Sequence, residues 1–442
     1  MEPNTENIID ARPTKEFFIY MLTKDIKLVR SIIDLVDNSW DGALRIEKDV
    51  QLTDLWIRLE VNETHFKISD NCGGMSYDLA KNYAFRFGRP KEMPLTHHSV
   101  GQFGVGMKRS LFKLGQKFKI ESNARDVTFV IEEDVNSWVE RQNWEFQFQS
   151  VKHFQEPRTW PNCGTTIVVT ELRESVQAEF GSEVFITQLK EGIQAAHQRS
   201  IERGIAISLN GVPLVAPIAK LLQSAELKAA RHELKFDEDT DSPVTVILYA
   251  GVDDSDPHAA GWSVFCNGRL VLDADVSSVT GWGEGNGRII TRFHNQFARF
   301  RGYAFFDCDN AAKLPWNTTK TGVDSDSPAY QSVRLRMIEM MRPVIDFLNR
   351  IDAEKDVEPD ERYLTSALDN ARHHKLETLT AATKFLFPVP PTKKQSKGPR
   401  MRRIQYDRLE SEIDLVKEAL GVSTLKDVGE GTFDYFYDLE CK

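Results

Sequence analysis

The amino-acid sequence predicts an α+β protein, with an N-terminal domain of helices and an antiparallel sheet, a second α/β domain and a helical C-terminal extension. Two observations support this prediction. Apolar residues recur at helical spacing over residues 14–46, and alternating apolar and polar residues then mark one strand after another up to residue 172. Because these strands follow one another without a helix between each pair, α+β is favoured over a parallel α/β fold.

The N-terminal domain is expected over residues 1–180. Its strands are predicted at 55–61, 65–69, 117–123, 127–132 and 165–172, and a helix is predicted from Lys108 to Leu114. Two glycine clusters, at residues 70–75 and 99–107, lie between these elements and predict turns.

A second domain is expected over residues 185–350. Strand patterns at 205–209, 244–250, 262–271 and 303–307 lead to a long helical pattern from about 330 to 351. Beyond it we expect a helical segment over 351–387, a proline-rich and basic linker over 388–404, and a helical, acidic tail over 405–442.

The composition indicates a globular, cytoplasmic protein. The 442 residues carry a formal net charge of -10, and no apolar run approaches the roughly 20 residues that a membrane span needs. The five cysteines are scattered without a CxxC spacing, which favours a reducing compartment over a disulfide or zinc framework. Within this acidic chain, residues 393–403 contain six basic residues and no acid.

The helical stretch from Ser31 to Ala43 contains polar residues among its apolar ones. Asp34, Asn38 and Asp41 stand at positions i, i+4 and i+7, so they share one helix face, which is either a solvated stripe or a polar site. An Asn oxygen suits Mg²⁺, and a carboxylate one turn earlier can polarise an attacking water.

The two glycine clusters admit a similar pair of readings. Asp70-Asn-Cys-Gly-Gly-Met75 follows a strand, where a carboxylate can accept a hydrogen bond from the amine of adenine and Gly74 leaves room for a flat base. Gly101-Gln-Phe-Gly-Val-Gly106 precedes a helix, where backbone N–H groups can approach an anion. For each cluster alone, an ordinary turn is the commoner interpretation.

Taken in order, these features resemble the GHKL (Bergerat-fold) ATPases, the superfamily of gyrase B, Hsp90, MutL, histidine kinases and MORC proteins. Residues 34–43 are similar to the N-box, 70–75 to the first glycine box and 101–106 to the second. Gly164-Thr-Thr-Ile167, in front of a strand, is similar to the Gly-Thr element that closes the adenine pocket.

The resemblance implies ATP and Mg²⁺ as ligands. Asp70 would bind the adenine amine, helped by Thr165 through water, with Gly74 and Met75 at the base. Asn38 would hold Mg²⁺.

On the phosphate side, the resemblance implies that Asp34 is the catalytic base and that Asp41 helps to order metal-bound water. Lys108 is a candidate phosphate contact, with a solvated helix residue as the alternative. Residues 76–100 would form a lid, and the phosphate-binding turn would comprise Gly101, Gln102, Phe103, Gly104, Val105 and Gly106.

Two positions depart from the family pattern. The base is Glu in most ATP-hydrolysing members, and here it is Asp34, whose arm is one methylene shorter and could slow hydrolysis. Cys72 occupies the first glycine position of the adenine box, which suggests a loop geometry of its own.

The second domain resembles the transducer domain (a ribosomal S5-like α/β domain) of gyrase, MutL and MORC relatives. Lys320, in a loop before the long helix, fits the lysine that reaches the γ-phosphate in those proteins, and Asn267-Gly-Arg269 resembles their strand turn. The whole resemblance covers about residues 15–350 and lies closest to MORC-like and bacterial Hsp90-like proteins.

The expected activity is slow, Mg-dependent hydrolysis of ATP. ATP binding is expected to close the lid and to promote formation of a homodimer. Three outputs remain open: a clamp on DNA through residues 393–403, a chaperone-like or signalling switch with a protein partner at the C-terminal tail, and a pseudo-enzyme that binds ATP without hydrolysing it.

Overall fold

The first helices of the chain are α1 (Lys15–Lys24) and α2 (Leu28–Arg45), separated by a short break. The structure is a computed structural model that describes residues 13–46, 50–88, 97–101, 104–158, 162–283, 290–389 and 404–442. Thr14 caps α1 by accepting a hydrogen bond from the backbone N–H of Phe17. The apolar side chains of α2, such as Ile32, Val36 and Trp40, are buried, so this helix lies in the core.

An eight-stranded sheet forms the body of the N-terminal part, in the order β5-β4-β3-β6-β2-β1-β7-β8. Its neighbouring strands are antiparallel except for β1 and β7, which are parallel. The strands are β1 (Trp56–Val61), β2 (Phe66–Asp70), β3 (Gly115–Asn123), β4 (Val127–Asp134), β5 (Phe148–His153), β6 (Gly164–Leu172), β7 (Ala206–Leu209) and β8 (Val212–Pro213).

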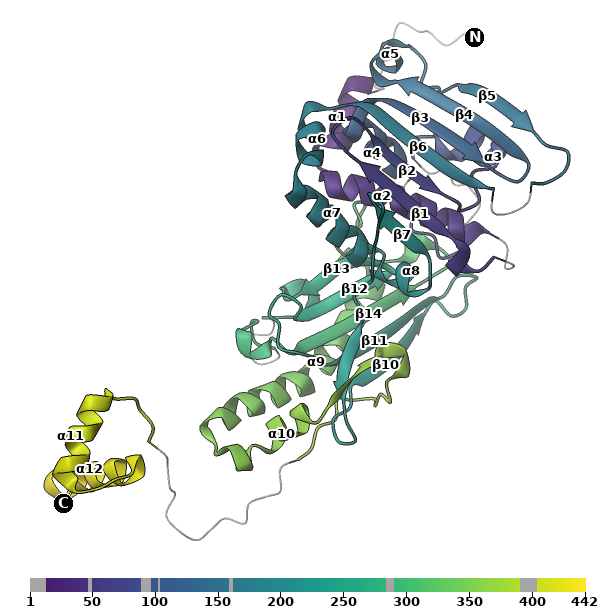
Figure 1. The fold of residues 1–442 in the computed structure, drawn as a ribbon. Coiled ribbons are helices and arrows are strands. Elements are labelled where there is room, and N and C mark those ends of the chain that lie inside the picture. Colours follow the sequence, from purple (N-terminus) through teal and green to yellow (C-terminus); the bar gives the residue numbers. More distant parts are fainter. Residues whose placement is uncertain are drawn as a thin grey trace, which may run out of the picture. The chain divides into compact units, whose positions relative to one another are not determined.

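Helices cover one face of this sheet, as Figure 1 shows for α2 and α4 behind the strands. Both α2 and α4 (Gly106–Leu114) pack against its central strands and against each other. The remaining helices here are the 3-10 helix η2 (Leu52–Asp54), α3 (Tyr77–Leu79), the π-helical turn η3 (Ala80–Ala84), α5 (Val135–Glu140), α6 (Glu174–Phe180), α7 (Glu183–Ala196) and α8 (Gln198–Glu202). The result is the mixed α+β architecture that the sequence predicts.

One predicted strand belongs to a different sheet from the one expected. Residues 205–209 were expected in the second domain, but Ala206–Leu209 pairs with β1, in the register Ile57 to Ile207. The expectation was wrong because strand pairing across about 150 residues leaves no local trace in the sequence.

A second, five-stranded sheet has the order β10-β11-β14-β12-β13. It comprises β10 (Ala230–Phe236), β11 (Val244–Val252), β12 (Gly261–Cys266), β13 (Arg269–Asp275) and β14 (Phe300–Asp307). The long helix α9 (Pro328–Ala353) packs against β10, β11 and β14 and buries apolar residues such as Val333, Met337 and Val344.

The predicted helical segment over 351–387 is only partly correct. Helix α10 spans Tyr363–Asp369, and the chain then forms β15 (Arg372–Lys375), which pairs with β9 (Lys220–Gln223). This pairing with a distant strand gives residues 372–375 backbone partners that a helix would have supplied locally.

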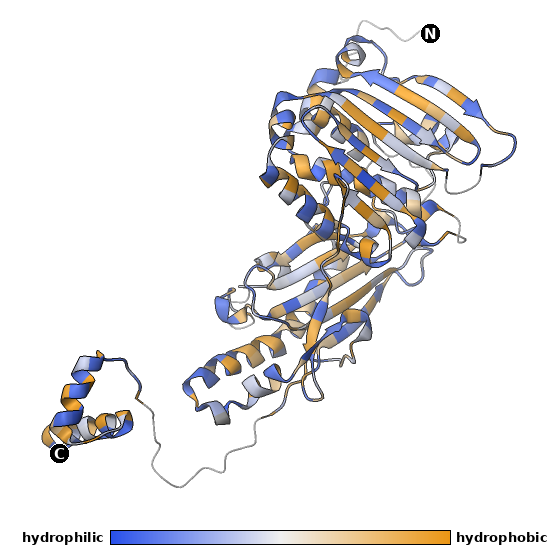
Figure 2. Cartoon of the chain, viewed as in Figure 1, coloured by the Kyte–Doolittle hydropathy of each residue, from blue (hydrophilic) through white to orange (hydrophobic). Residues whose placement is uncertain are grey.

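The contacts divide the chain into two units, residues 1–390 and 391–442. In the second unit, helices α11 (Glu410–Leu420) and α12 (Leu425–Glu440) contact each other but bury no residue. Figure 2 shows apolar residues on both helices, and large ones such as Leu415, Phe433 and Phe436 are more than half exposed. Across the described residues, no helix is both long and apolar enough to cross a membrane.

Candidate ATP-binding site

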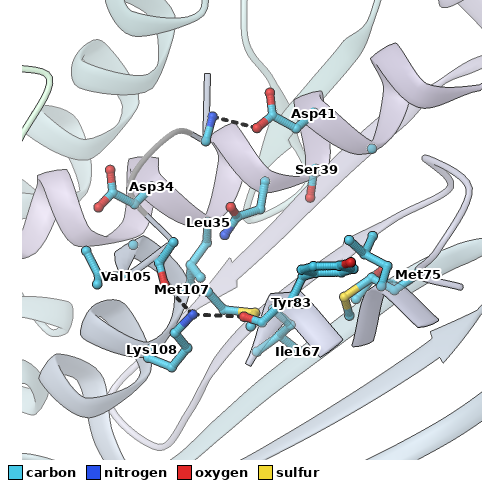
Figure 3. Close-up of a pocket in the computed structure, with 18 of the residues that line it drawn as sticks. Asp34, Leu35, Ser39, Asp41, Met75, Tyr83, Val105, Met107, Lys108 and Ile167 are labelled. Carbon is cyan, nitrogen blue, oxygen red and sulfur yellow. Dashed lines mark hydrogen bonds between the residues drawn. The ribbon is translucent and has the colours of Figure 1, made fainter. Parts of the chain in front are cut away.

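A pocket lies between α2, the end of β2, the start of β6 and the N-terminus of α4. Figure 3 shows Asp34, Ser39 and Asp41 along α2 on one side, with Lys108, Tyr83 and Met75 across from them. Two residues of the loop before α9 also line it, Thr318 and Lys320. The structure thus gathers in one cavity most of the residues that the sequence singled out, namely Asp34, Asn38, Asp41, Asp70, Gly74, Met75, Gly101, Gly104, Val105, Gly106, Lys108, Thr165 and Lys320.

Asp70, at the end of β2, is held by three hydrogen bonds. Its Oδ1 accepts from the backbone N–H groups of Cys72 (2.9 Å) and Thr165 (3.1 Å), and its Oδ2 accepts from the Ser39 hydroxyl (2.7 Å). Burial raises the pKa of this carboxyl, while the three donors act in the opposite direction. The position of Asp70 is therefore set by two strands and α2 together, and Ser39 is a contributor that the sequence analysis missed.

Two glycines let backbone segments approach each other closely at this end of the pocket. A Cβ on Gly164 would lie 1.9 Å from the carbonyl oxygen of Asp70, and a Cβ on Gly74 would lie 2.5 Å from that of Asn123. Gly74 also has φ +68°, which side chains rarely adopt. Cys72 is absent from the described residues with positive φ, which explains why this first glycine position of the box accepts a cysteine.

Asn38 lies on the pocket face of α2, one turn after Asp34. Its Nδ2 atom is buried and has no hydrogen-bond partner among the described residues. Buried amides are normally hydrogen-bonded, so this one is suited to a polar ligand in the pocket.

Asp34 is 3% exposed, and its Oδ2 accepts a hydrogen bond from the Nη2 of Arg109 at 2.5 Å. Its other oxygen, Oδ1, lies 3.8 Å from the Nζ of Lys320. Arg109, on α4, was not predicted as a site residue. Nothing in the sequence distinguishes Arg109 from its neighbours on α4. Its contact with Asp34 comes from the packing of α4 on α2.

Asp41 was expected to help order metal-bound water, and in the structure it contacts the backbone at the start of the glycine turn. Its carboxylate accepts hydrogen bonds from the backbone N–H groups of Val100 (2.7 Å) and Gly101 (2.6 Å). Burial raises the pKa of Asp41, and these two donors oppose the shift. The Gly101 N–H, expected to face phosphates, is thus directed at Asp41, and a Cβ on Gly101 would lie 2.6 Å from Asp41 Oδ2.

The rest of the glycine turn leads into α4, which begins at Gly106. Gly104 has φ +67°, and its carbonyl oxygen accepts a hydrogen bond from the Lys108 ammonium at 2.5 Å. Gln102 and Phe103 lie outside the described residues. The first N–H groups of α4 have no partner within the helix, so its N-terminus at the pocket is suited to an anion.

Lys108 is 2% exposed and also donates to the carbonyl oxygen of Ala84 at 2.8 Å. Burial lowers its pKa to about 7. Of the two readings from the sequence, the solvated helix residue is therefore wrong. The side chain links the glycine turn to the segment that was expected to form the lid.

Behind the pocket, a buried cluster joins α2 to the second sheet. Asp37 is 0% exposed, and its carboxylate lies 2.7 Å from Lys320 Nζ, 2.9 Å from Arg269 Nε and 3.1 Å from His197 Nε2. Burial by itself would raise the pKa of Asp37, but Lys320, Arg269 and His197 outweigh it and hold that pKa well below its ordinary value. We call these four residues the Asp37 cluster; of them only Lys320 was predicted as a site residue.

Asn267 provides a second link between the two parts. Its Nδ2 donates to the carbonyl oxygens of Ser99 and Cys308, both at 3.0 Å, and its Oδ1 accepts from the Cys308 N–H at 2.9 Å. The Asn-Gly-Arg turn noted in the sequence therefore supplies two contacts to the N-terminal part, one from Asn267 and one from Arg269.

A further ionisable group lies outside the pocket, where His373 Nε2 lies 2.8 Å from Asp253 Oδ1 and 3.2 Å from Asp254 Oδ2. These contacts join β15 to the end of β11 and are separate from the nucleotide-site candidates.

Comparison with known proteins agrees with this geometry. Residues 26–163 match the family described as histidine kinase-, DNA gyrase B-, and HSP90-like ATPase. No curated protein matches the chain. The matched range contains Asp34, Asn38, Asp70 and the glycine turn, whereas Thr165 and Lys320 lie beyond it. The match and the pocket together support placing the N-terminal part of this chain in the GHKL superfamily of ATPases.

Proposed function

We propose that this protein binds and slowly hydrolyses Mg-ATP, and that ATP binding acts as a conformational switch. The observation that supports it most is the pocket itself. From the end of β2 to the start of α4, the pocket is lined in turn by Asp70, Asn38 and Asp34. Adenine, metal and terminal phosphate would lie beside these residues in the same order.

The adenine end is supported by the hydrogen bonds of Asp70. A carboxylate has about four lone-pair sites, and three of them are taken by Ser39, Cys72 and Thr165. The remaining site suits the exocyclic amine of adenine, which donates two hydrogens. Met75 and Ile167 supply apolar surface for the flat ring.

The metal end is supported by Asn38. Its side-chain oxygen is a ligand that Mg²⁺ accepts, and its buried Nδ2, which has no hydrogen-bond partner among the described residues, can donate to a phosphate oxygen. Asn38 would hold Mg²⁺, which would supply positive charge next to the phosphates. Asn38 would orient the ion, and the N-terminus of α4 would hold the phosphates.

For hydrolysis, Asp34 would accept a proton from the attacking water. Arg109 fixes its Oδ2, and its Oδ1 lies 3.8 Å from the Nζ of Lys320. Residues 76–100 would act as the lid, closing over the nucleotide and promoting a homodimer; of these, residues 89–96 lie outside the described part.

We further propose a MORC-like output in which closure clamps DNA, with the second sheet acting as a transducer-like domain. The basic residues at 393–403 motivate it; they too lie outside the described part. Salt-dependent DNA binding that is lost when these six residues are neutralised would support it, and absence of binding at low salt would refute it.

Two alternatives have specific support. The exposed apolar residues of α11 and α12 favour a protein partner, because two helices without a buried residue cannot supply a core of their own. The Arg109 contact on Asp34 favours ATP binding without turnover.

The deciding experiment measures ATP turnover and oligomeric state, with and without DNA, for the parent and for Asp34→Ala. Turnover that is present in the parent and lost in the variant supports an ATPase. Tight ATP binding without turnover in the parent supports the non-hydrolysing alternative. Absence of ATP binding refutes the proposal.

A further inference from the structure

Besides His197, the Asp37 cluster and the neighbouring pair of Asp34 and Arg109 together hold two carboxylates, two arginines and one lysine. Asp37 is paired with Arg269 at 2.9 Å, and Asp34, one turn earlier, is paired with Arg109 at 2.5 Å. Lys320 lies between them, 2.7 Å from Asp37 and 3.8 Å from Asp34. Each buried carboxylate therefore keeps its own arginine whether or not the lysine is present.

We propose that Asp37 is a positioning residue that holds Lys320 at the edge of the pocket and exchanges it with the terminal phosphate of a nucleoside triphosphate. This inference rests on the proposed function, since it assumes that ATP occupies the pocket. It assigns a role to a carboxylate that neither binds metal nor acts as the base.

The geometry permits the exchange. Lys320 and Thr318 line the pocket, so the ammonium is already inside the cavity that would hold the phosphates. A lysine is a point charge on a flexible stem, which suits movement between two anions. When Lys320 leaves, Arg269 still pairs with Asp37, so no buried carboxylate is left without a cation.

The backbone of the loop is also held in a conformation that a residue with a side chain rarely adopts. Lys320 has φ +53°, a left-handed conformation that a residue with a side chain adopts only when its surroundings hold it there. The ion pair to Asp37 and the N–H bond from Lys320 to the carbonyl oxygen of Asn317 provide that hold. Loss of the ion pair would therefore alter the loop as well as the side chain.

The exchange would carry information to the second sheet. Arg269 begins β13 and Lys320 lies in the loop before α9, so Asp37 holds the second sheet through Arg269 and this loop through Lys320. A terminal phosphate would release the contact of Asp37 with Lys320 and leave its contact with Arg269 in place. ADP, which lacks that phosphate, would leave both contacts of Asp37 unchanged.

The test compares the affinities of ADP and of the non-hydrolysable triphosphate adenylyl imidodiphosphate in the full chain. Asp37→Asn removes the competitor for Lys320 at nearly the same shape. We expect its preference for the triphosphate over ADP to rise by roughly tenfold, the factor that corresponds to one charge-assisted hydrogen bond. A purely structural role would weaken both nucleotides alike and leave the ratio unchanged, which would overturn the inference.

A double-mutant cycle sharpens the assignment. Lys320→Met should lose the preference for the triphosphate, and Asp37→Asn combined with Lys320→Met should behave as Lys320→Met alone. An effect of Asp37→Asn that persists without Lys320 would overturn the inference. Asp346→Asn, an exposed acid on α9, is the matched control and should leave the ratio as in the parent.

If Asp37→Asn does not fold, hydrogen exchange on the parent decides. The triphosphate analogue should change exchange at the backbone N–H groups of Asn317 and Lys320, and ADP should not; equal effects of both ligands would overturn the exchange. Failure of the proposed function looks different, because the parent would then bind neither nucleotide, and the inference would fall with it.

Discussion

The Nζ of Lys320 and the Oδ2 of Asp37 lie 2.7 Å apart, although 283 residues separate them in the chain. Both groups are buried, and the contact brings the loop before α9 onto the helix that forms one wall of the pocket. The opposite charges also change each other's protonation: burial lowers the pKa of Lys320, but Asp37 and Asp34 more than compensate and raise it. The two carboxylates thus favour the charged form of Lys320.

Replacing Asp70 by Asn should weaken ADP binding by about 10- to 100-fold, because a hydrogen bond to a charged group contributes about 1.5–3 kcal/mol. The Asn side chain retains only one acceptor oxygen for the contacts that Asp70 makes with Ser39, Cys72 and Thr165. Isothermal titration calorimetry with ADP checks this, with Asp346→Asn as the surface control. An unchanged ADP affinity would show that Asp70 does not bind the base.

Replacing Asp34 by Ala should lower ATP turnover by about 10²- to 10⁴-fold, the usual contribution of a general base. ADP affinity should change little, because Asp34 lies at the α4 end of the pocket, beside Gly106 and Arg109. Steady-state phosphate release measures the turnover. Asp34→Glu tests the shorter arm: faster turnover than the parent would show that reach is limiting. Unchanged turnover in Asp34→Ala would refute the assignment of the base.

Stability should depend on pH through Lys108. Its pKa is about 7 in the folded protein, against 10.5 for an ordinary lysine, so between these values unfolding takes up a proton. Stability from this group therefore rises as pH increases from about 7 toward 10.5, with a slope of at most about 1.4 kcal/mol per pH unit.

Lys108→Met removes this titration, and thermal unfolding of the parent and the variant between pH 7 and 9.5 measures it. We expect the parent to gain stability relative to the variant as pH rises. Parallel curves would mean that Lys108 stays charged between the carbonyl oxygens of Ala84 and Gly104.

Gly164→Ala should destabilise the N-terminal part by about 1–3 kcal/mol, the usual cost of overpacking. The added Cβ would lie 1.9 Å from the Asp70 carbonyl oxygen, so β6 would have to move away from β2 and ADP affinity should fall with stability. Chemical denaturation and ADP titration check both. Gly429→Ala, at a helical site where a Cβ meets nothing within 4 Å, should leave the affinity unchanged. Equal behaviour of the two variants would contradict the close approach at Gly164.

The pocket face of α2 was predictable because its geometry is local. A helix places residues 34, 38 and 41 on one side whatever surrounds it, and the structure finds all three at the pocket. Strand alternation likewise predicted the ends of β1, β2, β3, β4 and β6 to within two residues. The resemblance to the GHKL ATPases, which these motifs carry, then implied ATP as the ligand.

The contacts of Asp37 were not predictable in the same way. Asp37 is off the pocket face of α2, and its partners His197, Arg269 and Lys320 come from three later segments. The same reason explains the errors in the fold: β7 pairs with β1, and β15 pairs with β9, through hydrogen bonds that cross long stretches of chain.

The sequence by itself determined helix α2, five strands of the first sheet and most polar residues of the pocket, because helix and strand periodicity act over a few residues. Only the tertiary structure decided which charges meet. It directed Gly101 to Asp41, Arg109 to Asp34 and Lys320 to Asp37. A buried charge needs a partner wherever in the chain that partner lies, and packing alone determines which residue comes within reach.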